Sequence, residues 1–180
     1  MWWSRKNVSF FFVVVLVLAT ATACAGFRPL YGRDAGGNSV AALEMARTKI
    51  LPIEDRVGQQ LHNNLLDLMT PRGVPANPVY VLSVKLTTST SELGIRKTGF
   101  ATRANLNARA SLTLTDTATN KTLLSGSHRI VGGYDLLDSE YATLVSEKNA
   151  KTRAAEELAH AIRSQVSVYF LQRAKGKTKR

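Results

Sequence analysis

The chain has 180 residues, of which 44% are hydrophobic, so it is long enough for one domain with its own core. Its 24 Lys and Arg against 13 Asp and Glu give a formal net charge of +11. This charge favours polyanionic partners, whether nucleic acid or anionic lipid, although a basic surface can also serve solubility alone. The single cysteine, Cys24, excludes an intramolecular disulfide.

Residues 1–23 have the pattern of a secretory signal peptide. A short basic start precedes an unbroken apolar run over 10–19, and small residues lead up to Cys24. The apolar run is too short to span a bilayer, which needs ~20 residues. We therefore expect an exported protein, which meets lipid headgroups and phosphorylated glycolipid and, as a rule, no nucleic acid. Ordinary cleavage near Ala23, with an incidental thiol on Cys24, is the alternative to a modified cysteine.

Residues 24–46 are expected to form a tether, followed by a domain over 47–172. The first strand is predicted at 49–53, where Pro52 cannot donate to a sheet ladder and so indicates a sheet edge. A helix is predicted to follow, starting at the acidic pair 54–55 and stopping before Pro71 and Gly73. Its apolar residues recur at helical spacing: Val57, Leu61, Leu65, Leu66, Leu68 and Met69.

Alternating apolar and polar residues predict three further strands, over 80–87, 103–114 and 123–131. The polar stretch 88–102 is expected to be a loop, and Gly132-Gly133 is expected to end the last strand.

A second helix is predicted over 139–172, with Ser139 as its cap. Its inward stripe is expected to comprise Leu144, Ala155, Leu158, Ile162, Val166 and Tyr169. The basic tail 173–180 lacks apolar anchors and is expected to be disordered. The element order β-α-β-β-β-α predicts an α+β fold: a four-stranded, mainly antiparallel sheet with two helices packed on one face.

No catalytic or metal-binding motif is present in the sequence. His62, His128 and His160 are scattered singly, without the spacing of zinc ligands. No nucleophile elbow surrounds a serine, and no phosphate-binding glycine loop follows a predicted strand. We therefore expect a protein that is not an enzyme, and that has no metal and no cofactor other than lipid on Cys24.

Two motifs in the region around Cys24 carry a resemblance to known proteins. Ala21-Thr22-Ala23-Cys24 resembles the lipobox of bacterial lipoproteins, in which the cysteine receives a diacylglycerol and an N-acyl chain. The run Cys24-Ala-Gly-Phe-Arg-Pro-Leu-Tyr-Gly32 resembles the opening of the LPS-assembly lipoprotein LptE (RlpB) family, with Ala25 as one extra residue. Weaker matches are Gly132-Gly-Tyr134, Tyr141-Ala142 and Arg153-Ala-Ala-Glu-Glu-Leu158.

The resemblance implies a lipoprotein anchored in the outer membrane and facing the periplasm. It implies that the domain plugs an LptD-type β-barrel, and that the two together insert lipopolysaccharide into the outer leaflet. By the family pattern Arg96 and Lys97, in the loop between the second and third strands, contact lipopolysaccharide, with Lys148 as a second site.

Two other functions remain open on the sequence alone. One is a periplasmic lipoprotein auxiliary to an envelope phospholipid transporter, which would use the same basic surface. The other is a nucleic-acid-binding module with a misleading leader, which would need exposed aromatic residues among its basic ones.

Overall fold

The computed structural model describes residues 40–95 and 101–178. The chain divides into two compact units, 1–32 and 33–180, and every described residue belongs to the second. The described elements, in chain order, are α2 (Val40–Met45), β1 (Thr48–Ile50), α3 (Arg56–Met69), β2 (Tyr80–Ile95), β3 (Ala101–Asp116), β4 (Thr122–Asp135) and α4 (Glu140–Thr178).

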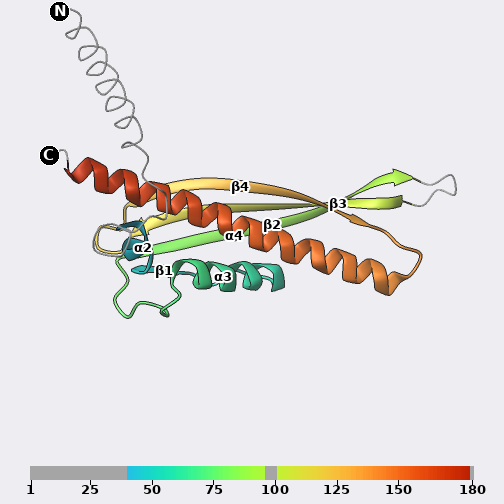
Figure 1. Cartoon of the computed structure of the whole chain (residues 1–180), viewed down its shortest axis with the longest axis horizontal. Coiled ribbons are helices and arrows are strands. Elements are labelled where there is room, and N and C mark those ends of the chain that lie inside the picture. The colour runs from blue at the N-terminus through green and yellow to red at the C-terminus, as the bar shows by residue number, and fades with distance from the viewer. Residues whose placement is uncertain (1–39, 96–100, 179–180) are drawn as a thin grey trace, which may run out of the picture. The chain divides into compact units, whose positions relative to one another are not determined.

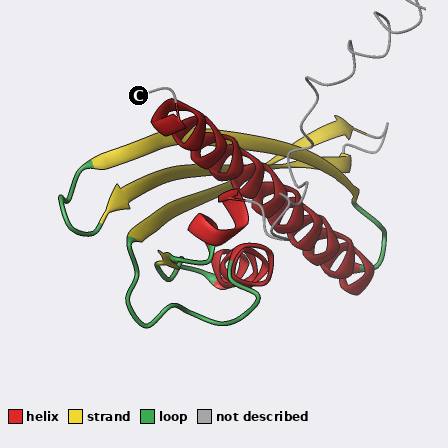
Figure 2. Cartoon of the chain, turned by 60° about the vertical axis from the view of Figure 1, so that its left-hand side comes forward, coloured by secondary structure: helices red, strands yellow, loops and turns green. Residues whose placement is uncertain are grey.

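The strands form one sheet in the order β1-β2-β3-β4, so β1 and β4 lie at its edges. β1 pairs with β2 in parallel, whereas β2–β3 and β3–β4 are antiparallel. The long helix α4 crosses one face of the sheet obliquely, and α3 lies beside it (Figures 1 and 2). The predicted α+β fold with a mainly antiparallel sheet is therefore confirmed. The first strand lies at a sheet edge as predicted, but it spans Thr48–Ile50 and ends before Pro52.

Strand alternation places the core on the face that α4 covers. On β2 and β3 many of the side chains directed to this face are buried, among them Leu82, Val84, Leu106, Leu112 and Leu114. They pack against buried side chains of α4, including Leu158, Ile162 and Val166. On α3 the buried residues are Gly58, Leu61, Leu65 and Met69, as the helical spacing predicts.

The hairpin of β2 and β3 is longer than predicted. Residue pairing continues from Thr88–Ala108 out to Ile95–Ala101, so most of the polar stretch 88–102 is strand and not loop. Thr88 and Thr90 lie on the face of the core, yet both are exposed. This part of β2 has no apolar layer to pack against. Its sequence therefore lacks the alternating pattern by which a strand is predicted.

The last strand also continues past its predicted end. Gly132 pairs with Leu106 and Gly133 with Asn105, and β4 ends only at Asp135. A Cβ added to Gly133 would lie 3.1 Å from the Arg103 guanidinium, the end of an exposed and flexible side chain that can move aside. The glycine pair predicts a break, whereas the strand passes through it.

A third helix, α2, occupies part of the segment that was expected to be a tether. Ala41 and Met45, four positions apart, are both buried in the core. A helix of 6 residues is too short for periodicity to be recognised in a sequence.

Helix α4 continues to Thr178 instead of ending at residue 172. Its last turns are attached to β2 at Tyr80. The ring centroids of Tyr80 and Phe170 lie 5.0 Å apart, and the Arg173 guanidinium carbon lies 5.8 Å from the Tyr80 centroid. These contacts give the basic segment the anchor that its own composition lacks.

The inward stripe of α4 is confirmed for its carboxyl-terminal half and wrong at Leu144. Ala155, Leu158, Ile162 and Val166 are buried, and Tyr169 is half-buried. Leu144 is 61% exposed because the first turns of α4 extend beyond the sheet, as Figures 1 and 2 show.

Candidate functional site: a basic groove beside an exposed apolar patch

The site residues predicted from sequence fall into two groups. Cys24, Arg96 and Lys97 lie outside the described residues. Lys148 is described: it is exposed on the amino-terminal half of α4. The geometry of a candidate site can therefore be built around Lys148.

Lys148 lines a groove of about 360 Å³ between α3 and α4. The first turns of α3 contribute Arg56, Val57 and Gln60, and α4 contributes Leu144, Glu147, Lys148 and Lys151. Residues three and four apart share one face of a helix, so α4 presents its four lining residues to α3 together. The groove thus combines three cations, one carboxylate and two aliphatic side chains.

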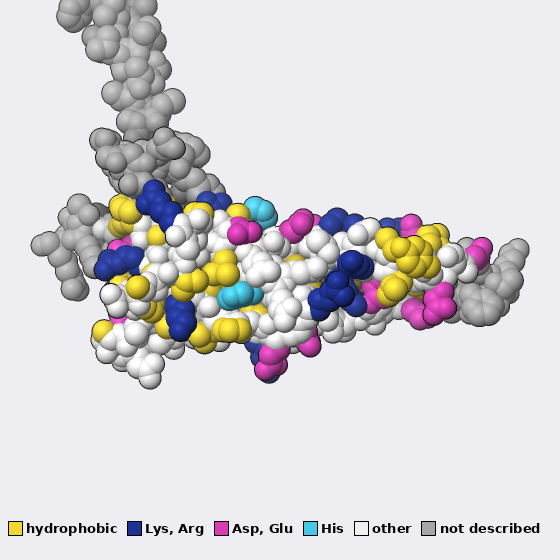
Figure 3. Space-filling view, turned by 90° about the horizontal axis from the view of Figure 1, so that it is seen from below, with side chains coloured by type: hydrophobic (Ala, Val, Ile, Leu, Met, Phe, Trp, Pro, Cys, Tyr) yellow, Lys and Arg dark blue, Asp and Glu magenta, His cyan; other side chains and the backbone are white. Residues whose placement is uncertain are grey.

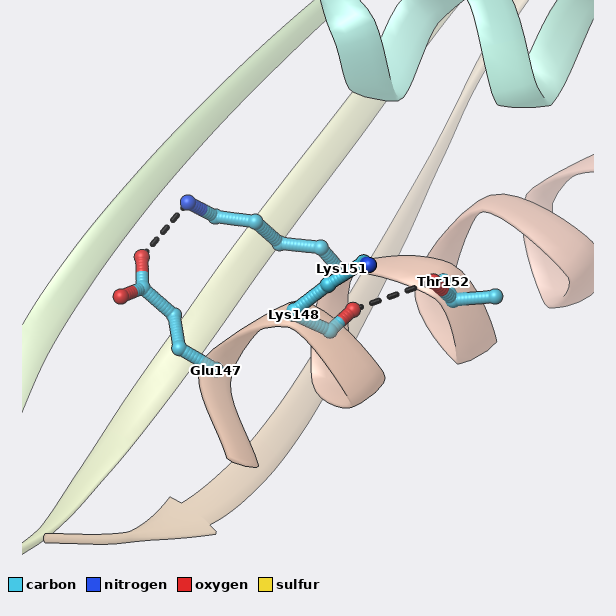
Figure 4. A network of polar contacts seen from close by, with 4 residues as sticks. All are labelled: Glu147, Lys148, Lys151 and Thr152. Carbon is cyan, nitrogen blue, oxygen red and sulfur yellow. Dashed lines mark hydrogen bonds and ion pairs between the residues drawn. The ribbon is translucent and has the colours of Figure 1, made fainter. Parts of the chain in front are cut away.

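An ion pair within α4 neutralises one of the three cations of the groove and leaves the other two charged. Lys151 Nζ lies 2.5 Å from Glu147 Oε1, one helical turn away, which neutralises that lysine (Figure 4). The other contact drawn there is a hydrogen bond from the Thr152 hydroxyl to the backbone carbonyl of Lys148, at 3.0 Å, and it leaves the ammonium group unaffected. Among the described residues, Arg56 and Lys148 have no carboxylate partner and can receive an anion.

An exposed apolar patch adjoins the groove where α4 begins. We call Leu137, Tyr141, Leu144 and Val145 the apolar patch; they are 52%, 76%, 61% and 39% exposed. Figure 3 shows hydrophobic side chains gathered beside Lys and Arg side chains toward this end of the molecule. Large side chains gathered at this exposure indicate a contact surface.

Local hydrogen bonds hold the start of α4 that carries this patch. The Thr143 hydroxyl accepts from the Leu137 backbone N–H at 2.8 Å and donates to the Leu137 carbonyl at 3.1 Å. The Ser139 hydroxyl accepts from the Ala142 N–H at 3.4 Å, so the predicted cap is present, though the bond is long. The loop and the first turn are therefore tied together, and the apolar patch has a defined position.

Sequence patterns did not reveal Arg56, Lys151 or the apolar patch. Arg56 and Lys148 are far apart in the chain and line one groove only because α3 and α4 pack together. The spacing of Leu144 predicts a core position, although the residue is exposed. A signal was available in the polar segment 146–153, whose composition already set this half of the helix apart.

The described residues contain no group of three or more His, Cys, Asp and Glu placed to hold a metal ion. Within the same residues, no helix has the length and apolar content needed to cross a membrane.

Comparisons with known proteins bear on the fold. No family model matches the chain. An uncharacterized protein of Rickettsia prowazekii, RP188, is 22% identical over 162 residues, which cover 90% of this chain and 99% of that protein.

Three solved structures share the fold. A candidate lipoprotein from Caulobacter crescentus CB15 has a TM-score of 0.59 at 21% identity, covering 73% of this chain and 96% of its own. A minor lipoprotein from Acinetobacter baumannii has a TM-score of 0.55 at 21% identity, covering 68% of this chain and 92% of that chain. Lipoprotein B from Nitrosomonas europaea, which is uncharacterized, has 0.53 at 17% identity, covering 80% and 92%. The chain therefore has a fold that is found in bacterial lipoproteins.

Proposed function

We propose that this protein is an outer-membrane lipoprotein, anchored through acyl chains on Cys24 and facing the periplasm. In this proposal it plugs and helps to assemble an LptD-type β-barrel, and it binds the lipopolysaccharide that the barrel inserts into the outer leaflet. The export pattern, the motif after Cys24 and a fold found in lipoproteins support it. The observation that carries the ligand is the groove with two unneutralised cations beside the apolar patch.

The groove fits an amphiphile with an anionic head. Arg56 and Lys148 supply N–H donors and positive charge for a phosphate, and charge-assisted hydrogen bonds of this kind are among the stronger polar contacts. Leu144 and Tyr141 offer apolar surface next to them. Lipid A carries both phosphates and acyl chains, so one molecule satisfies both halves of the site. Arg96 and Lys97 are proposed as further lipid A contacts.

No bond is made or broken in this role. Binding competes with the contacts that hold lipopolysaccharide in aggregates, and the plug supports folding of the barrel around it. The proposed protein therefore acts as a partner and carrier, not as an enzyme.

The barrel partnership is tested by a mild-detergent pull-down of the tagged, lipidated protein from outer membranes, with mass identification of what co-purifies. We expect a large barrel at equal stoichiometry that survives washing. Recovery of the protein alone would contradict the plug role. In a parallel preparation, Cys24→Ser should move the protein from the membrane to the soluble fraction if lipid on this cysteine is its anchor.

The ligand is tested by lipopolysaccharide binding to the purified full chain carrying Arg56→Gln and Lys148→Gln. We expect affinity to fall about tenfold at low salt, because two charge-assisted contacts are removed. The matched control carries Lys121→Gln and Arg153→Gln, which remove the same charge from exposed positions outside the groove. An equal loss in both variants would show attraction by net charge alone and would overturn the groove as the site.

The groove also favours a second candidate: a periplasmic lipoprotein auxiliary to an envelope phospholipid transporter. A phospholipid likewise combines a phosphate with acyl chains, so the same cations and apolar patch could hold it. The pull-down separates the two functions, since this role predicts transporter subunits and no stable barrel.

A further inference from the structure

The face of the sheet opposite α4 carries an uncompensated basic cluster. Residue pairing places Lys49, Lys85, Arg103, Arg109 and Arg129 on this face, with Asp135 as its only carboxylate among the described strands. Asp135 pairs with Arg103, at 4.0 Å, six positions along β4 from Arg129. The cations in the middle of the face therefore have no acidic neighbour among the described residues.

Arg109 and Arg129 are directly opposite each other on β3 and β4. Opposite residues on one face have Cβ atoms about 4.5–5.5 Å apart, and like charges there destabilise the pair. Lys85 is on the same face, opposite Ser111 and thus diagonal to Arg109, a separation of about 7–8 Å. All three cations are exposed, and no described ion pair involves any of them.

Neutral hydrogen-bonding side chains surround these three cations. Asn107 Oδ1 accepts from Arg129 Nη2 at 2.6 Å, which restrains that guanidinium. Neighbouring positions on the face are Thr87, Ser89, Ser111 and Ser127. The cluster thus combines two guanidinium groups, one ammonium group and several hydroxyl donors. An anion bound among them would relieve the repulsion between the positive charges.

We propose that Arg109, Arg129 and Lys85 form a binding site for a phosphate monoester on the outer face of the sheet. A carboxylate has one charge and two oxygens, which a single guanidinium can satisfy. A phosphate monoester has up to two charges and three free oxygens, so it can accept from two arginines and a lysine at once. The site is separate from the groove and goes beyond the proposed function.

Protection of individual arginines from phenylglyoxal tests the site in the full-length protein, held in mild detergent micelles at constant ionic strength. One arm adds inorganic phosphate, and the other replaces phosphatidylcholine with phosphatidic acid, a lipid phosphate monoester, in mixed micelles. We expect modification of Arg109 and Arg129 to slow at least threefold, while Arg72 and Arg153 react unchanged. Protection by inorganic phosphate identifies a site for free phosphate, and protection by phosphatidic acid alone identifies a lipid headgroup. Absence of protection in both arms, or equal protection of all four arginines, would overturn the proposal.

A second measurement uses the thermal midpoint and does not depend on arginine chemistry. Both proteins compared carry the groove substitutions Arg56→Gln and Lys148→Gln, so that ligand binding in the groove does not contribute. The ligand that protects the arginines should raise the midpoint of this groove variant, but not that of the same protein with Arg109→Gln and Arg129→Gln added. These side chains are exposed, so the variant is expected to fold. An effect that remains in the groove variant separates this site from the proposed lipopolysaccharide groove. Absence of the effect in the groove variant, or its persistence after Arg109 and Arg129 are also replaced, would contradict the assignment.

Discussion

The two halves of α4 lie in opposite environments, one buried and one exposed, although they belong to one continuous helix. In the carboxyl-terminal half Leu158, Ile162 and Val166 are completely buried against the sheet. In the amino-terminal half Tyr141 and Leu144 are 76% and 61% exposed, and Lys148 lines a groove against α3. The difference follows from the path of the helix, which crosses the sheet and then leaves it (Figure 1). Side chains of the same character are core where a sheet lies beneath them and contact surface where none does.

The strongest test of this difference between the two halves is to shorten one leucine in each. Leu158→Ala should lower the free energy of unfolding by about 3 kcal/mol, because it leaves a cavity in a packed interior. Leu144→Ala should change it by less than about 0.5 kcal/mol, as expected for an exposed position. Denaturant unfolding of both variants measures the difference. Comparable losses would mean that the amino-terminal half is packed as tightly as the other.

The attachment of the carboxyl-terminal half at Tyr80 can be tested with Tyr80→Phe. Burial raises the pKa of the Tyr80 hydroxyl above its ordinary value of 10.0; a hydrogen bond to Glu44 and that carboxylate's charge raise it further, against the opposing charges of Arg173 and Arg47. Removing the hydroxyl should cost about 1 kcal/mol at neutral pH through the lost hydrogen bond.

The same variant carries a pH signature. The folded protein binds the phenolic proton more tightly than the unfolded chain does, so the contribution of Tyr80 is fully present below pH 10 and is lost as the pH rises through the raised value. The unfolding free energy of the parent should therefore fall more steeply above pH 10 than that of Tyr80→Phe. Parallel curves in that range would show that the hydroxyl is not held in the folded state.

Close contact between α4 and β4 can be tested at Gly126. A Cβ there would collide with the Gln165 side chain, which is hydrogen-bonded to His128 Nε2 at 2.7 Å. Because the glutamine end can move aside, Gly126→Ala should cost only about 0.5–1 kcal/mol, the worth of that hydrogen bond. In a double-mutant cycle, adding Gly126→Ala to Gln165→Ala should cost nothing further. Full additivity in unfolding experiments would remove Gln165 as the reason for this glycine.

The smallest effect on stability is expected in the apolar patch, where the effect on binding should be clear. Leu144→Ser with Val145→Ser should alter the free energy of unfolding by about 0.5 kcal/mol or less. The same variant should bind lipopolysaccharide severalfold more weakly, because apolar surface beside the groove is lost. A stability loss above about 2 kcal/mol would mean that the apolar patch is part of the core.

Sequence alone determined the elements whose packing is regular. The spacing of Leu61 and Leu65 predicted α3, and the alternation around Leu82 and Leu112 predicted strands with one buried face, because burial on a single face repeats with the period of the element. The α+β class followed from the order of these elements.

Only the tertiary structure decided the environment of the residues that lie beyond the region where α4 packs on the sheet. The exposed end of the β2–β3 hairpin has no buried face to pattern its residues, and Leu144 is exposed because α4 has left the sheet. Helix packing brings Arg56 and Lys148 to one groove, and strand register places Arg109 opposite Arg129. A local pattern records whether a residue is covered, whereas the neighbours it meets across the molecule are set by how distant segments pack.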